Sequence, residues 1–418
     1  MTASGAPPRA PRQAALGFIY AAVMMNVVTM GVTAPVFPVL LKTLAHADDA
    51  HGARIAGVFG AAWAVMQFIF APIFGSLSDR FGRRPVLLVS MFGLALDYVI
   101  MALAPSIAWL FIGRIISGMT SASSSAAGAY VADISTEENR ARNFGRFQAA
   151  ANFGIVLGPI LGGYLGDLNP RAPFWVAAGL AFANGLYGLF VVPESLSQDR
   201  RMPFRWSRAN PVGAFKMLSR PVLVGLAFLP FLTQFAGMSF NSVFQFYTHY
   251  RFAWGPKDIG FLLIVLGVGS AVVQSFLSGE AAKRLTERGA ILLGLALGAS
   301  GFALMGLAPT LNIFWIGVGL IIVGGISFPN TQSMMSRRVG ADEQGQLQGA
   351  LTIFLGITGF FGPLLFTTAF AWSIGPGKGL GVPGLSILIG SALIATAFVV
   401  ALFVAKPLKL AEAAPPLS

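Results

Sequence analysis

The feature that most constrains this sequence is a succession of apolar blocks, each about 20 residues long, which is the length a helix needs to cross a bilayer. Lipid offers the backbone no hydrogen-bond partners, so every block that crosses it must be a helix. Only 11% of the 418 residues are charged, whereas soluble domains carry roughly 25%. The sequence therefore predicts an all-α integral membrane protein.

Twelve spans are predicted, at residues 14–41, 54–77, 85–104, 107–132, 144–166, 173–192, 221–248, 258–279, 289–308, 311–334, 346–372 and 383–405. The longest hydrophilic segment separates the first six from the last six. We therefore expect an N-terminal six-helix bundle over residues 1–192, a cytoplasmic linker over 193–220 and a C-terminal six-helix bundle over 221–418.

Basic residues are distributed unevenly between the two sides of the predicted membrane. Of the 28 Lys and Arg residues, 21 fall on one side and six on the other, and Arg114 remains inside a span. Because basic loops stay in the cytoplasm, both termini are predicted there, with the protein in a bacterial-type inner membrane. The net charge of +12 is spread over short loops, so nucleic-acid binding is not expected.

Several chemical classes are excluded by what the sequence lacks. There is no cysteine, and the three histidines fall at predicted loops or helix ends, so neither disulfides nor a zinc site is expected. There is also no P-loop and no nucleophile paired with a base. We expect a monomer that is not an enzyme and needs no cofactor, whose partners are a small-molecule substrate, protons and the lipid bilayer.

Two short patterns recur at a spacing of 204 residues. GSLSDRFGRR begins at Gly75 and GEAAKRLTER at Gly279, and the Gly-Pro pair at 158–159 returns at 362–363. A parallel duplication of one six-helix unit explains this spacing, and such duplicated halves are typical of secondary transporters.

The strongest local motif lies in the loop between the second and third spans. Its residues are Gly75, Asp79, Arg80, Gly82, Arg83 and Arg84. An aspartate beside three arginines predicts an ionic latch that holds helix ends together in one conformation. Asp133, at the end of the fourth span, is expected to be near enough to join it. Solvated charges in a cytoplasmic loop are the alternative.

This loop resembles the signature of the major facilitator superfamily, G-x-x-x-D-R-x-G-R-R. Arg114 in GRIISG resembles the superfamily's buried arginine motif. The residues that resemble the motif of drug/proton antiporters are Gly154, Gly158, Pro159, Gly162 and Gly163. Regularly spaced glycines present a bare backbone to a neighbouring helix, so helix packing alone is the other interpretation.

Longer stretches are similar to the tetracycline-efflux branch of that superfamily. They are DRFGRRPVLLVSMFGLALDYVIMALAP, GRIISGMTSASSSAAGAYVADIS and NFGIVLGPILGG. The resemblance implies export of a drug, in that branch as a divalent-cation chelate, in exchange for an incoming proton.

Asp97 and Arg114 are the clear cases of charge inside predicted spans, where each charge costs roughly 2.5–3.5 kcal/mol on insertion scales. Asp97 matches an acidic position of the tetracycline exporters, and a low dielectric favours the protonated form of a carboxylate, as a proton carrier requires. We expect Asp97 to couple protons or substrate, with Arg114 biasing its titration. A structural pair with Arg114 is the alternative.

The sequence also departs from that branch. Positions that carry an acid in tetracycline exporters are Asn26 and Gly298 here, and a histidine of some members is Ser270. These side chains cannot carry protons in the same way. The sequence predicts proton-coupled efflux of small amphipathic drugs, tetracycline-like or multidrug, by alternating access; the alternative is a proton-coupled transporter of a sugar or other native metabolite.

Amide side chains within the spans are candidates for the lining of a substrate cavity. They are Asn26, Gln67, Gln234, Asn241, Gln245 and Gln274. The spacing of Gln234, Asn241 and Gln245, by 7 and then 4, places these three on one helical stripe. For each amide taken alone, an interhelical hydrogen bond is the competing role.

Overall fold

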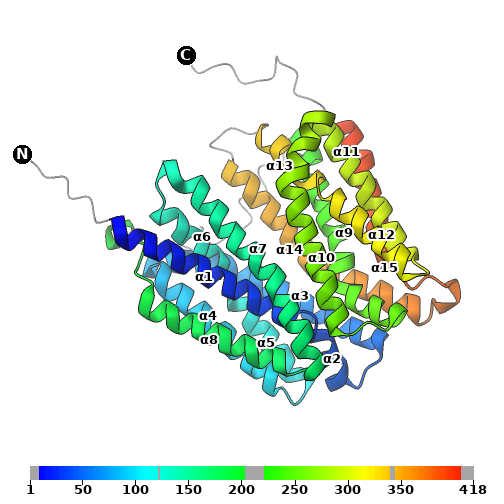
Figure 1. The fold of residues 1–418 in the computed structure, drawn as a ribbon, viewed down its shortest axis with the longest axis horizontal. Coiled ribbons are helices and arrows are strands. Elements are labelled where there is room, and N and C mark those ends of the chain that lie inside the picture. The colour runs from blue at the N-terminus through cyan, green and yellow to red at the C-terminus, as the bar shows by residue number, and fades with distance from the viewer. Residues whose placement is uncertain (1–8, 121–122, 203–220, 339–343, 406–418) are drawn as a thin grey trace, which may run out of the picture. The chain divides into compact units, whose positions relative to one another are not determined.

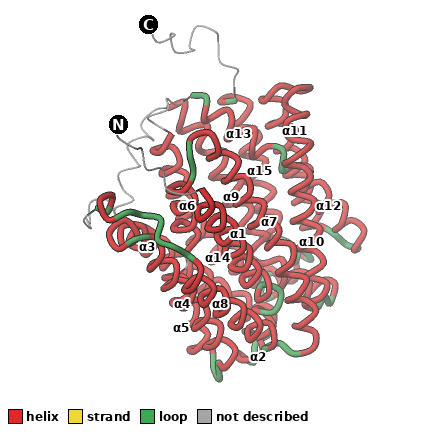
Figure 2. The backbone as a smooth tube through the Cα atoms, turned by 60° about the vertical axis from the view of Figure 1, so that its left-hand side comes forward, coloured by secondary structure: helices red, strands yellow, loops and turns green. Residues whose placement is uncertain are grey.

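The computed structural model describes residues 9–120, 123–202, 221–338 and 344–405. Figure 2 shows helices joined by short loops throughout this part of the chain. The chain divides into two compact units, of which the first contains Met1–Pro211 and Thr248–Gly267 and the second contains Val212–Tyr247 and Val268–Ser418. Residues 203–220 of the predicted linker lie outside the described residues.

The helices up to residue 191 belong to the first unit (Figure 1). They are α1 (Arg9–Thr33), α2 (Phe37–Ala45), α3 (Asp49–Phe81), α4 (Arg83–Leu103), α5 (Ile107–Thr120), α6 (Ser123–Ile134), α7 (Glu137–Leu168) and α8 (Ala172–Val191). The remaining helices are α9 (Pro221–Phe252), α10 (Pro256–Val272), α11 (Ser278–Leu307), α12 (Leu311–Gly324), α13 (Ser327–Ser336), α14 (Gln344–Ile374) and α15 (Leu385–Val404). A π-helical turn, Val273–Leu277, joins α10 to α11.

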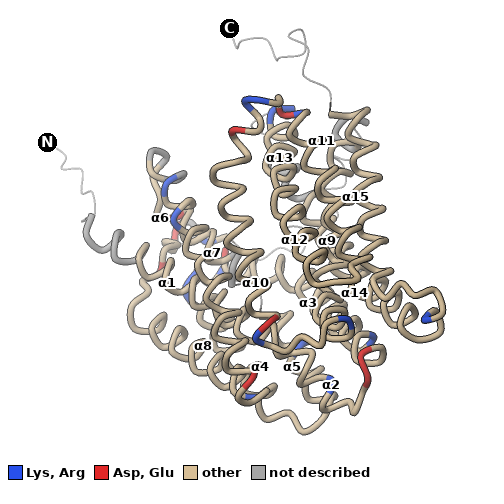
Figure 3. The backbone as a smooth tube through the Cα atoms, turned by 45° about the vertical axis from the view of Figure 1, so that its right-hand side comes forward, with Lys and Arg blue, Asp and Glu red and all other residues tan. Residues whose placement is uncertain are grey.

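The surface of these helices suits lipid. Among the described residues, nine helical stretches are long and apolar enough to span a membrane, and one of them, Pro256–Leu307, contains both α10 and α11. Bulky apolar side chains stand exposed, such as Phe190 at 81% and Phe276 at 72%. Charged residues gather toward helix ends (Figure 3). Because water does not favour so much exposed apolar surface, the predicted all-α membrane fold is confirmed.

Three predicted spans do not form one continuous helical stretch among the described residues. The span at 14–41 breaks at 34–36 between α1 and α2, where Pro35 lacks a backbone donor and disfavours helix at the residue before it. The span at 311–334 breaks after Gly324, between α12 and α13. The span at 107–132 contains α5 and α6, and the two residues between them lie outside the described part.

The glycines of α7 bring two helix backbones together. Within the first unit, α1 packs most extensively against α7. A Cβ on Gly154 would lie 2.8 Å from the carbonyl oxygen of Met24, and one on Gly158 would lie 2.6 Å from the Cα of Gly31. Later glycines of α7 meet later residues of α1, so the two helices run in the same direction. Any larger side chain at these positions forces the helices apart.

Candidate functional site

Asp97 lies in the middle of the first unit, on α4, with 0% of its surface exposed. Arg114 and Ser117 of α5 are its polar neighbours. Within the described residues, neither carboxylate oxygen makes a hydrogen bond of normal geometry. The guanidinium of Arg114 instead lies over the ring of Phe37, 4.1 Å from the ring centre. The acid and the arginine are therefore electrostatic neighbours without a direct ion pair.

The space for this carboxylate is created by a missing side chain. A Cβ on Gly113 of α5 would lie 2.7 Å from Oδ1 of Asp97. The adjacent Tyr98 is 4% exposed, and its hydroxyl meets the hydroxyls of Thr29 and Thr33 on α1. Thus α1, α4 and α5 converge around one buried acid. Such a group can take up or release a proton with little competition from fixed hydrogen bonds.

A second polar cluster lies at the end of the first unit where α4 begins. Arg83 forms ion pairs with Asp79, at 2.6 Å, and with Asp133 at the end of α6, at 3.0 Å. Its guanidinium also donates to Ser78, at 3.1 Å. One side chain thus ties together the end of α3, the start of α4 and the end of α6.

Glu194 completes this cluster, and the sequence analysis did not single it out. Its carboxylate accepts hydrogen bonds from the backbone N–H groups of Arg83, at 2.8 Å, and Arg84, at 3.2 Å. These are donors that the start of α4 leaves unpaired, because the capping position is Gly82 and has no side chain. A carboxylate at a helix N-terminus also complements the helix dipole. The only sequence signal is an acid directly after the sixth apolar block.

The other predicted latch residues are placed differently. Arg80 lies over the ring of Phe81, 5.0 Å from its centre. Arg84 donates to the carbonyl oxygen of Leu189 on α8. A Cβ on Gly75 would have nothing within 4 Å. Among the described residues, the ion pairs of this cluster are therefore made by Asp79, Arg83 and Asp133 from the predicted set, while Glu194 adds hydrogen bonds to backbone N–H groups.

The second unit repeats this cluster with its charges exchanged. Glu287 and Arg337, which are 204 residues after Arg83 and Asp133, form an ion pair at 3.3 Å. The backbone repeats as well, because Gly82 has φ +107° and ψ 160°, and Thr286, 204 residues later, has φ +68° and ψ 161°. The shared turn agrees with the predicted duplication, while the acid and the base have changed places.

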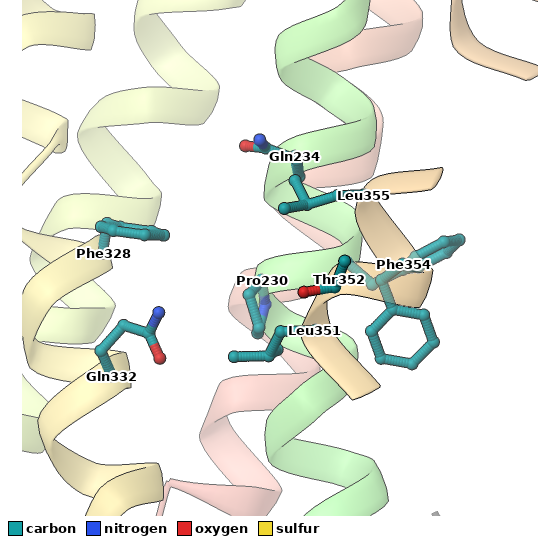
Figure 4. Close-up of a pocket in the computed structure, with 9 residues that line it drawn as sticks. Pro230, Gln234, Phe328, Gln332, Leu351, Thr352, Phe354 and Leu355 are labelled. Carbon is teal, nitrogen blue, oxygen red and sulfur yellow. The ribbon is translucent and has the colours of Figure 1, made fainter. Parts of the chain in front are cut away.

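The second unit also holds a pocket of about 170 Å³. It is lined by Pro230, Phe231, Gln234, Phe328, Gln332, Leu351, Thr352, Phe354 and Leu355. Figure 4 shows Phe328 and Gln332 on one side, facing Gln234 of α9 and the residues of α14 across the gap. The ring of Phe231 packs against that of Phe354, with centres 5.1 Å apart. Among the described residues, the lining has amides, a hydroxyl and aromatic rings but no charged side chain.

Of the six amides predicted to line a cavity, Gln234 lines this pocket. Asn26 on α1 and Gln67 on α3 belong to the first unit. In the second unit, Asn241 and Gln245 lie further along α9, and Gln274 lies in the π-helical turn. Gln332 was not predicted because the sequence does not show whether a single amide side chain in an apolar helix points into a cavity.

Comparison with known proteins gives the family. The model of the Major Facilitator Superfamily matches residues 19–363. The chain belongs to this superfamily. It is 40% identical over 384 residues to the class C tetracycline resistance protein of Escherichia coli, covering 91% of this chain and 94% of that one. It is 35% identical to the class D protein of Salmonella ordonez, covering 92% and 95%.

Within the superfamily, the chain thus lies in the branch of the tetracycline resistance proteins. A bacterial homologue of the human lysosomal transporter Spinster, in an inward-facing and occupied conformation, has the same fold, with a TM-score of 0.74, 15% identity and coverage of 98% and 100%. Membership of this superfamily makes the chain a membrane transporter and not an enzyme, as predicted from the sequence.

Proposed function

We propose that this transporter exports small amphipathic drugs, tetracycline-like or multidrug, in exchange for protons, by alternating access of two six-helix halves. The halves are residues 1–192 and 221–418, joined by a linker at 193–220. The identity to tetracycline resistance proteins over nearly the whole chain supports drug efflux and antibiotic resistance. The excess of basic residues on one side supports an inner-membrane location with both termini in the cytoplasm. We propose a monomer, as expected from the family resemblance.

The observation that carries proton coupling is the state of Asp97. It is fully buried, its oxygens lack normal hydrogen bonds among the described residues, and the positive charge of Arg114 is held nearby over Phe37. A protonated Asp97 makes this site formally positive, and loss of the proton makes it neutral overall. Each proton therefore changes the charge that the membrane interior must accommodate, and that change is the link between protonation and conformation.

The latch clusters would hold one of the alternating conformations. Asp79, Arg83 and Asp133, with Glu194, join four segments of the first unit by charged contacts at one end. The antiporter-motif residues Gly154, Gly158, Pro159 and Gly162 would contribute by letting α7 and α1 move as one packed pair, and Gly163 lies against the start of α10. Both roles follow from packing and charge rather than from substrate contact.

For the drug, we propose the pocket of the second unit as one contact region. Planar rings stack on aromatic side chains, and ring carbonyl and hydroxyl groups match the amides of Gln234 and Gln332. Gln332→Leu should raise the drug concentration for half-maximal transport several-fold, since a buried polar group of the drug then lacks its partner. Gln198→Leu, which replaces an exposed amide outside this pocket, is the matched control.

The test of the whole proposal uses acid-loaded inside-out vesicles that contain the full chain. Addition of tetracycline with Mg²⁺, or of lipophilic drugs, should release protons. Asp97→Asn should abolish the release while the protein still reaches the membrane, and the exposed Asp167→Asn should not. Proton release that survives in Asp97→Asn would refute the assignment of coupling to this residue.

A metabolite transporter is the second candidate, and one observation favours it. Asn26, Ser270 and Gly298 stand where members of the branch carry ionisable groups, so the coupling machinery is reduced. Cells that express the chain, gain no drug resistance and instead accumulate or release a sugar would support this alternative over drug export.

A further inference from the structure

A pocket at the edge of the membrane lies between α1 and α7, apart from the buried acid and the latch. Its volume is about 540 Å³, within the range of ligand sites. It is lined from α1 by Tyr20 and from α7 by Asn139, Arg142, Asn143 and Arg146. The apolar stretches of the two helices, Leu16–Thr33 and Arg142–Leu168, both begin here. The pocket therefore lies at the level where lipid headgroups meet water.

The charged side chains that line this pocket in the described part of the chain are both arginines, so its charge is positive. Arg142 and Arg146 are one helical turn apart on α7, and both side chains are exposed. Within the described residues, no carboxylate forms an ion pair with either guanidinium. Guanidinium groups on an exposed helix face can bind a planar or tetrahedral oxyanion from outside.

A third donor points to the same ligand. The hydroxyl oxygen of Tyr20 is buried and has no hydrogen-bond partner among the described residues, and both arginines act on it electrostatically. A buried hydroxyl without a partner costs free energy unless a ligand or water satisfies it. An anion held by the two arginines would accept a hydrogen bond from this hydroxyl. Tyr20 belongs neither to the latch, nor to the buried site around Asp97, nor to the antiporter motif.

Hydrogen bonds hold the asparagine side chains on the α7 side of the pocket in place. The amide of Asn143, 2% exposed, donates to Ser135 at 2.9 Å and to Asn139 at 3.1 Å. Asn139 also accepts from the backbone of Thr136 at 2.9 Å and so caps the start of α7. The arginines thus project from a helix whose first turns are fixed.

We propose that this pocket binds a phosphate anion, supplied by the headgroup of an anionic phospholipid. Basic pockets between membrane helices on the cytoplasmic side are suited to anionic headgroups, and the orientation proposed above places this one there. Phosphate in solution offers the same chemistry, so the experiment must separate the two sources. A bound headgroup would join α1 near Tyr20 to α7 near Arg142, and these are the helices that the glycines hold in contact.

The test measures the thermal stability of the purified full chain in a neutral detergent during titration with three probes. These are a short-chain phosphatidylglycerol, the matching phosphatidylcholine and inorganic phosphate. Arg142→Gln combined with Arg146→Gln should weaken phosphatidylglycerol binding roughly thirtyfold, since each basic residue near an anionic surface contributes about fivefold. Lys283→Gln combined with Arg284→Gln removes the same charge at an exposed site outside the pocket and should leave binding unchanged.

Tyr20→Phe keeps the ring and removes only the unpaired hydroxyl, so it remains informative if the double arginine variant does not fold. It should weaken phosphatidylglycerol binding roughly tenfold, as for a lost hydrogen bond to a charged group. Stabilisation by inorganic phosphate with the same dependence on Arg142, Arg146 and Tyr20 would keep the anion site and assign it to phosphate in solution. Equal binding of phosphatidylglycerol and phosphatidylcholine, or wild-type affinity in the pocket variants, would overturn the proposal.

Discussion

Gly82→Ala should open the latch of the first unit without touching any of its charges. The glycine has φ +107°, a conformation that residues with a Cβ rarely adopt. A Cβ built there would lie 2.6 Å from Cδ of Glu194. Alanine therefore strains the backbone and pushes away the carboxylate that caps α4.

The size of the effect follows from these two contributions. Backbone strain of this kind costs about 1–3 kcal/mol, and loss of a helix N-cap costs about 0.5–2 kcal/mol. Allowing for partial relaxation, the latched state should lose roughly 2–4 kcal/mol, which corresponds to about a 30- to 1,000-fold increase in the open population.

The chain has no cysteine, so one introduced thiol reports local opening. Leu196 is 7% exposed, and its backbone N–H donates to Glu194 at 3.0 Å. In a Leu196→Cys background, maleimide labelling should accelerate with the open population when Gly82 is replaced by alanine. Gly75→Ala is the matched control, because a Cβ there meets no atom within 4 Å.

Equally slow maleimide labelling of the introduced thiol in folded Gly82→Ala and Gly75→Ala proteins would refute this prediction. That result would mean that Glu194 keeps its cap despite the added methyl group, or that the segment after α8 is held by other contacts. Equal acceleration in both variants would instead indicate a general effect of alanine in this region.

Three further variants test neighbouring features. Thr286→Gly should increase the free energy of unfolding by about 1 kcal/mol, measured as a higher melting temperature. Relief of backbone strain at φ +68° outweighs the loss of one weak hydrogen bond from the Gly289 N–H to the threonine hydroxyl. Arg83→Glu and Asp133→Arg should each destabilise by about 1–3 kcal/mol, whereas the double exchange should recover only part of it in thermal unfolding, because Asp79 loses the ion pair that it forms with Arg83. Gly113→Ala displaces the carboxylate of Asp97 and should slow proton-coupled transport about tenfold while equilibrium drug binding stays near wild type.

The helices could be predicted from sequence because their causes are local. A helix satisfies its own backbone, and the bilayer fixes its length, so runs of apolar residues mark the spans. Breaks within spans were harder to predict, since Pro35 interrupts a helix while Pro159 lies inside one. The difference arises from the neighbours that satisfy the backbone around each proline, and these are tertiary.

One part of the candidate site could also be predicted from a local cause. Asp97 stood out because a charge inside an apolar block is costly wherever it points. The space that Gly113 leaves for it, the stacking of Arg114 on Phe37 and the cap from Glu194 depend on residues distant in the chain. No periodicity or spacing in the sequence predicts those contacts.

The sequence by itself determined that this chain is a duplicated helical membrane transporter, because hydropathy, charge bias and a repeat of 204 residues act through local chemistry and simple topology. Only the tertiary structure decided that the repeated latch has exchanged its acid and base, and that Arg142, Arg146 and Tyr20 line one pocket. The physical reason is that a charge acquires its role from the partners that packing brings within a few ångströms, and packing joins residues that the sequence keeps far apart.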